Sequence, residues 1–139
     1  MLKLTYPLFA MILVALAACA LPGKMYSLND GTESAFEIQR SSGTGGMTAH
    51  NPKTGERFTG QYTATPIGGG TSRIDIDLGG TKSGTGTVYT PPSYANARGI
   101  LRGDKGTVIS VYLDIRPGLR PTGHGEGVDN IGNRYQFQF

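Results

Sequence analysis

Apolar and polar residues alternate along much of the chain beyond Lys24, and no stretch there has apolar residues at helical spacing. Alternation of period two is typical of a strand with one buried face and one wet face. It is clearest in residues 72–78, 107–115 and 134–139. We expect residues 72–78 to bury their aliphatic face, residues 107–115 to form a central strand, and the terminal Phe139 to be buried.

The composition also favours a sheet protein, because 22 glycines and 8 prolines disfavour helix interiors and supply turns. Weaker strand patterns lie at residues 35–40, 46–51, 57–65, 85–90 and 98–102. Turn sequences separate them at 51–55, 103–106 and 130–133. The sequence therefore predicts an all-β fold, a small antiparallel barrel-like or folded-sheet domain of about seven or eight strands, since closure removes exposed edges.

Glycine occupies every second position of residues 123–127, so one face of that strand has no side chains. We expect a large neighbour such as Tyr135 or Phe137 to lie over it. Residues 55–62 and 132–139 share a pattern of turn glycine, polar residue, arginine and alternating aromatics. Two hairpins that converge on the same pattern and a true internal repeat both remain open as explanations.

The amino-terminal residues have the layout of an export signal, with Lys3, an apolar run over residues 8–16, and the sequence Leu-Ala-Ala-Cys ending at Cys19. They resemble the lipobox of bacterial lipoproteins. The resemblance implies a diacylglycerol on the thiol of Cys19, cleavage between Ala18 and Cys19, and acylation of the new amino terminus. It divides the chain into a signal peptide (1–18), a lipidated tether (19–24) and one β domain (25–139). Ala20 stands where an aspartate would retain such a protein at the inner membrane, so we expect a lipid-anchored protein of the cell envelope, at the outer membrane.

Two other interpretations fit this segment less well. A transmembrane helix needs roughly 20 consecutive apolar residues, and prolines at positions 7 and 22 interrupt this run. An ordinary secretory signal cleaved after Ala20 also satisfies the small-residue pattern. Lipidation explains the position of Cys19, the only cysteine, whose use as an anchor leaves no thiol for a disulfide. Beyond the signal, the chain is similar to small uncharacterised glycine-rich bacterial lipoproteins, and that diffuse likeness implies no activity.

Charge and motif spacing argue against several functions. The formal net charge is +3 and includes Lys3 of the signal, and no basic run forms a stripe for nucleic acid. His50 and His124 lack partners at metal-ligand spacing, so we expect no metal site and no cofactor. Asp75 and Asp77 are accounted for as the wet face of a strand. Residues 79–86 lack the spacing of a phosphate-binding loop, and we predict no catalytic residues.

Two features favour recognition. Tyr94 lies in an apparent loop, residues 91–97, and Arg116 and Arg120 flank a proline-containing turn. We therefore expect a lipid-anchored envelope protein with a non-enzymatic binding or structural role. The membrane would be its partner through the acyl chains on Cys19, and an envelope protein or glycan a second partner. The alternatives are a periplasmic inhibitor of a lysozyme-like enzyme acting through the 91–97 loop, and an envelope enzyme.

Overall fold

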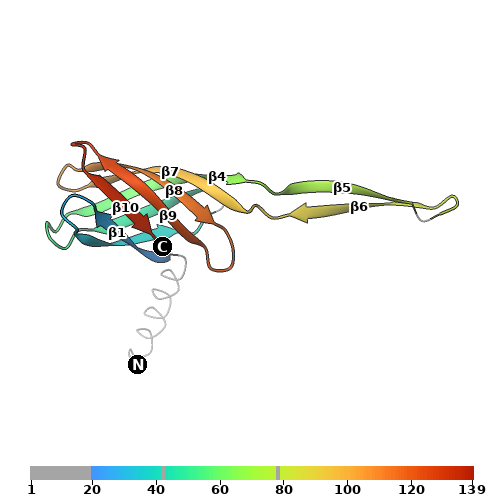
Figure 1. The fold of residues 1–139 in the computed structure, drawn as a ribbon, viewed down its shortest axis with the longest axis horizontal. Coiled ribbons are helices and arrows are strands. Elements are labelled where there is room, and N and C mark those ends of the chain that lie inside the picture. Colours follow the sequence, from blue (N-terminus) through green and yellow to red (C-terminus); the bar gives the residue numbers. More distant parts are fainter. Residues whose placement is uncertain (1–19, 42, 78) are drawn as a thin grey trace, which may run out of the picture.

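The computed structural model describes residues 20–41, 43–77 and 79–139, and every regular element within them is a β-strand. The strands are β1 (Ala20–Ser27), β2 (Glu33–Gln39), β3 (Thr44–His50), β4 (Arg57–Ile67), β5 (Gly70–Asp77), β6 (Ser83–Thr90), β7 (Tyr94–Gly103), β8 (Val108–Arg116), β9 (Thr122–Asp129) and β10 (Arg134–Gln138). Eight of them close into an antiparallel barrel, and β5 and β6 form a separate two-stranded sheet (Figure 1). The predicted all-β barrel is confirmed.

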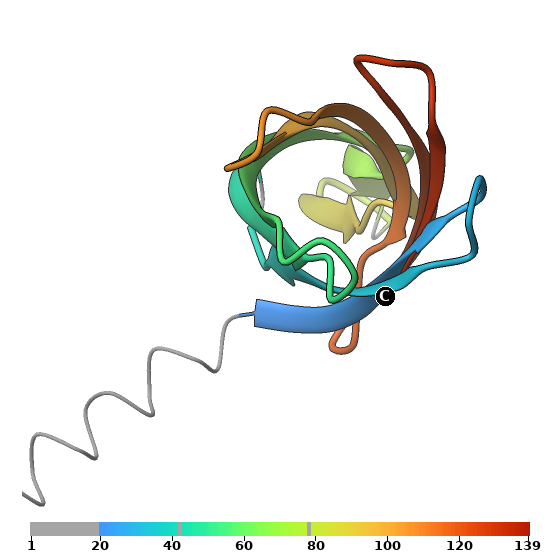
Figure 2. The same cartoon turned by 90° about the vertical axis from the view of Figure 1, so that its left-hand side faces the viewer.

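The barrel follows chain order except at one point. Its strands are arranged β1-β10-β9-β8-β7-β4-β3-β2, so β4 pairs with β7 rather than with β5. This pairing runs from Phe58 opposite Gly103 to Ile67 opposite Tyr94. The β5–β6 ribbon is inserted between Ile67 and Tyr94, and it therefore projects from one end of the barrel (Figure 1). Figure 2 shows the strands of the barrel as a closed ring.

The core lies inside this ring and is built from the inward positions of each alternating strand. Phe36, Phe137, Leu101 and Ile109 are at most 1% exposed. The rings of Phe36 and Phe137 meet edge to face with centroids 5.1 Å apart, the geometry that aromatic quadrupoles favour. Each such side chain contributes roughly 1.5–3 kcal/mol through burial, so packing stabilises the barrel.

The glycine face of β9 makes room for aromatic residues of the carboxyl-terminal segment, as the sequence predicts. A Cβ at Gly127 would lie 2.8 Å from Cε2 of Phe137. At Gly123 a Cβ would overlap the ring of Phe139, which is partly buried and packs against the core. The missing side chains on β9 thus allow large rings to fill the barrel beside it.

A buried polar network closes the barrel at the end opposite the ribbon. Glu56 accepts hydrogen bonds from the backbone N–H groups of Lys105 and Thr107, both at 3.1 Å, and from the Thr107 hydroxyl at 2.9 Å. Asp129 accepts a hydrogen bond from the Tyr135 hydroxyl at 2.9 Å. These hydrogen bonds satisfy the two buried carboxylates. The carboxylates therefore do not require contact with water at this end of the barrel.

Asp129 is buried, with only 7% of the residue exposed. Burial acts to raise its pKa, but hydrogen bonds from Asn133, Tyr135 and Ile131 outweigh that effect, and the pKa is lowered. Burial and the hydrogen bond to Asp129 both raise the pKa of Tyr135. The pair therefore holds one proton on the phenol and none on the carboxylate across the neutral range.

Two predictions about individual segments are wrong. Every residue of β5 is exposed, including Ile74 and Ile76, because β5 pairs only with β6 and no other layer covers it. Residues 20–24, predicted as a tether, form the first part of β1 and pair with β2 from Ala20 opposite Gln39 onward. Pairing to a closed barrel stabilised this glycine- and proline-containing segment as a strand, which its own sequence did not indicate.

Candidate binding site

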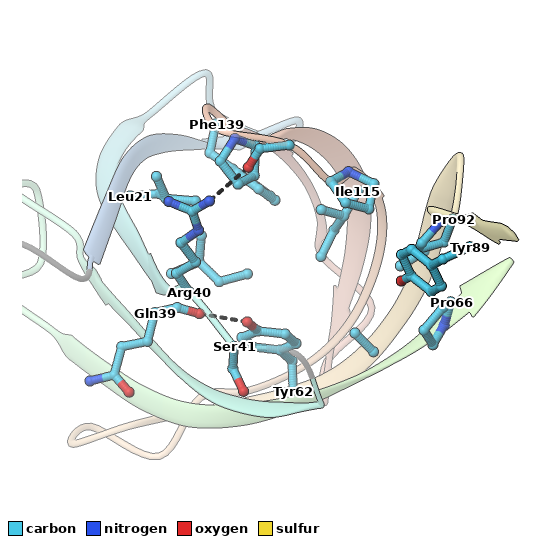
Figure 3. Close-up of a pocket in the computed structure, with 16 residues that line it drawn as sticks. Leu21, Gln39, Arg40, Ser41, Tyr62, Pro66, Tyr89, Pro92, Ile115 and Phe139 are labelled. Atoms are coloured by element: carbon cyan, nitrogen blue, oxygen red, sulfur yellow. Dashed lines mark hydrogen bonds between the residues drawn. The ribbon is translucent and has the colours of Figure 1, made fainter. Parts of the chain in front are cut away.

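A cavity of about 490 Å³ opens at the end of the barrel from which the ribbon projects (Figure 3). Its apolar walls come from the ends of the barrel strands and from the base of the ribbon. They include Leu21, Ile38, Ala64, Pro66, Tyr89, Pro92, Ala95, Ile115 and Phe139. This size lies within the roughly 300–1,000 Å³ range of small-molecule sites, which are mostly apolar with a few polar groups.

On β4 and β7 the inward side chains become smaller towards this end, which makes room for the cavity. Along β4 the inward positions include Phe58 near the closed end and Ala64 at the cavity, and along β7 they include Leu101 and Ala95 in the same sense. Large residues fill a small barrel completely, whereas alanines leave space. The sequences of β4 and β7 therefore contribute to a barrel that is filled at one end and hollow at the other.

Two polar groups lie at the cavity wall. The hydroxyl of Tyr62 donates a hydrogen bond to the carbonyl of Gln39 (Figure 3), and burial raises the pKa of Tyr62. The guanidinium of Arg40, directly after β2, donates a hydrogen bond of 2.7 Å to the carbonyl of Gly118. This bond joins the end of β2 to the β8–β9 loop, so Arg40 extends over part of the opening.

Two further arginines lie at the end of β8 and in the segment that follows it, although neither lines the cavity. Arg116 ends β8 and Arg120 lies in the following loop, and between them Pro117 and Gly118 line the cavity. All three arginines are exposed. The ion pairs among the described residues use other cations, namely Lys24, Lys53, His124 and Arg134. The open end thus combines an apolar interior with Arg40 in its wall and two exposed arginines in the adjacent segment.

The structure brings together some of the residues predicted to bind a partner. Tyr94 is the first residue of β7 and pairs with Ile67, so the prediction that it lies on a loop is wrong, and the connection shortens to residues 91–93. Its side chain is half exposed and shares a shallow surface depression with Arg116. Arg120 lies outside that depression. The short connection leaves no protruding 91–97 loop to enter an enzyme's active site.

The histidines and aspartates for which the sequence predicts no metal or catalytic role are dispersed over the structure. His50 ends β3, whereas His124 on β9 faces solvent with its Nε2 3.9 Å from Oδ2 of Asp114. Asp75 and Asp77 lie on the exposed ribbon. Within the described part of the chain, no three His, Cys, Asp or Glu side chains form a group that could hold a metal ion.

Sequence reasoning missed most of the cavity. Arg40, Tyr62 and the alanines at positions 64 and 95 carry no motif, and only the barrel brings them to one end. The one available signal was the small size of inward residues near the ends of β4 and β7. It becomes readable only when the strand directions are known.

Ala18 and Cys19, the predicted cleavage and lipidation residues, lie outside the described residues. Within residues 20–41, 43–77 and 79–139, no helix is long and apolar enough to cross a membrane. Comparisons with protein-family models, with curated proteins and with solved structures found no match to this chain.

Proposed function

We propose that this chain is a lipid-anchored protein of the bacterial cell envelope, without enzymatic activity, whose open barrel end binds an anionic amphiphile. The observation that carries the proposal is the apolar cavity with Arg40 in its wall, and with Arg116 and Arg120 in the segment that also supplies the cavity-lining Pro117 and Gly118. Transfer of an acyl chain from water into such an apolar cavity is favourable. A phosphate or carboxylate headgroup is the natural partner of a guanidinium at the opening.

The position of the chain's first described strand supports the anchor. Cys19 is bonded to Ala20, and Ala20 begins β1 opposite Gln39, whose carbonyl accepts the Tyr62 hydrogen bond at the cavity. Acyl chains on Cys19 would therefore hold this end of the barrel at the bilayer with almost no slack. Cleavage before Cys19 would also leave the whole of β1 intact. The cavity would then open where amphiphiles are concentrated.

Binding is tested with the chain that begins at Cys19, titrated with a fluorescent long-chain fatty acid. The variant Ala64→Phe fills the cavity, and we expect it to weaken binding about tenfold or more, equivalent to about 1.4 kcal/mol. The double variant Arg40→Gln, Arg120→Gln tests the arginines and should weaken binding of the fatty acid more than that of its uncharged alcohol. Arg57→Gln, at the closed end of the barrel, is the matched control.

Two results would contradict the proposal. Fatty-acid affinity that is equal in the native chain and in Ala64→Phe would exclude the cavity as the site. For the anchor, mass spectrometry of the protein extracted from its own membranes should show a lipid on Cys19. A free thiol at that residue in the native protein would overturn the lipoprotein assignment.

A further inference from the structure

The β5–β6 ribbon has one apolar face and one polar face. Paired residues in an antiparallel ribbon point to the same side, so the register places Ile74 opposite Gly86 and Ile76 opposite Gly84 on one face. Val88 completes that face, opposite Ser72. These three aliphatic side chains are 45–47% exposed. The opposite face carries the charged Arg73, Asp75 and Asp77 along the ribbon, and Tyr89 opposite Thr71 at its base.

No part of the described barrel covers the apolar face. The ribbon projects away from the barrel (Figure 1), and its two strands pair only with each other. An isolated two-stranded hairpin is marginally stable in water. Residues 73–77 of β5 alternate between charged and aliphatic side chains, which is the pattern of a strand that buries one side. The ribbon is therefore suited to contact with a surface outside its own protomer.

The dimensions of the ribbon favour a bilayer over a protein as that surface. Strands of eight residues are about 26 Å long and about 5 Å apart, so the face is about 26 by 10 Å. Stable protein complexes bury about 800 Å² on each partner, several times this area. A bilayer requires no such minimum when the chain is already tethered, because a tether makes the second contact intramolecular.

We propose that the apolar face of the β5–β6 ribbon lies in the interfacial region of the membrane, with its aliphatic side chains among the upper acyl carbons. The inference rests on the proposed anchor, because Cys19 adjoins the barrel end from which the ribbon projects. The polar face and the unpaired strand edges stay with headgroups and water, since unsatisfied backbone groups exclude a lone hairpin from the hydrocarbon core. The ribbon acts as the strand counterpart of an interfacial amphipathic helix.

The chain contains no tryptophan, so a single introduced indole reports on each face separately. Ile76→Trp places it on the apolar face, and Thr85→Trp places it on the polar face opposite Asp75. The chain beginning at Cys19 is coupled through this sole cysteine to a maleimide lipid in vesicles of equal phosphatidylcholine and phosphatidylglycerol. We expect the Ile76→Trp indole to emit at shorter wavelength and to be quenched roughly twofold more by brominated acyl chains, from its position in the interface.

Equal quenching of the two indoles would overturn the inference. A blue shift of the Ile76→Trp variant that appears without vesicles and grows with protein concentration would overturn it in favour of a second copy of the chain. Near-ultraviolet circular dichroism of the barrel tyrosines shows that both variants are folded. Chemical coupling replaces biological acylation, so ribbon contact in this assay is measured whether or not native Cys19 carries lipid. Failure of the anchor and failure of the ribbon are thereby separated.

Discussion

The ring of Phe139 lies over the backbone of Gly123, and the two residues also exchange a pair of backbone hydrogen bonds of 2.9 and 3.0 Å. A side chain at Gly123 would occupy the position of the ring. Because Phe139 lines the cavity and packs against Phe36 with ring centroids 6.1 Å apart, this one contact couples the glycine pattern of β9 to the shape of the binding site.

Replacing Gly123 by alanine should therefore alter binding as well as stability. The Phe139 ring can rotate away from a new Cβ, but only by changing the wall of the cavity. We expect Gly123→Ala to weaken fatty-acid binding severalfold and to lower the free energy of unfolding by about 1 kcal/mol, a typical value for a single substitution. Fluorescence titration and urea unfolding measure the two effects. Gly86→Ala, whose Cβ meets nothing within 4 Å, should change neither, and unaltered affinity in Gly123→Ala would contradict the role of Phe139.

The Asp129–Tyr135 pair should make stability depend on pH at both extremes. The lowered pKa of Asp129 gives stability that is present above its ordinary value of 3.8 and is lost as the pH falls below it. The raised pKa of Tyr135 gives stability that is present below its ordinary value of 10.0 and is lost as the pH rises above it. Tyr135→Phe should cost about 1.5–3 kcal/mol at neutral pH, the usual contribution of a hydrogen bond to a charged group, and should reduce the alkaline loss. Urea unfolding across pH tests this, and an alkaline slope identical to that of the native chain would count against the pair.

Glu56 should be replaceable by glutamine but not by alanine. Glutamine keeps an acceptor for the N–H groups of Lys105 and Thr107, and its amide can donate to the Thr107 hydroxyl in place of the present bond. Alanine leaves partly buried donors without this acceptor, which costs at most about 1–3 kcal/mol for a group. Thermal unfolding should rank native above Glu56→Gln, and Glu56→Gln well above Glu56→Ala. The same loss in both variants would show that the charge rather than the hydrogen bonds is required.

Removal of the ribbon should leave the barrel folded. Deleting residues 70–90 joins β4 to β7 by a short loop next to the existing Ile67 and Tyr94 pair. The deleted strands pair only with each other, so we expect the free energy of unfolding to change by no more than about 1 kcal/mol, the scale of a difference in loop closure. Chemical unfolding with circular dichroism measures it. Loss of cooperative unfolding would mean that the ribbon belongs to the barrel's folding unit.

Most strands were predictable because local patterns specify them. Residues 107–115 alternate strictly and form β8 with Ile109, Val111 and Leu113 in the core. The turns at 51–55, 103–106 and 130–133 occur where glycine and asparagine permit them. The cavity was not predictable in this way, because Arg40 and Gly118 are 78 residues apart and meet only when the barrel closes.

Alternation by itself determined that the chain forms amphipathic strands, which residues share a face, and that the glycines of β9 leave space for aromatic rings. Only the tertiary structure decided what covers each face. Residues 72–77 and 107–115 have the same period-two pattern, yet β8 has a strand on each side within the barrel and β5 has one partner and no layer above it. The physical reason is that a pattern records how a strand divides into apolar and polar sides. The neighbour that buries the apolar side depends on pairing between distant segments.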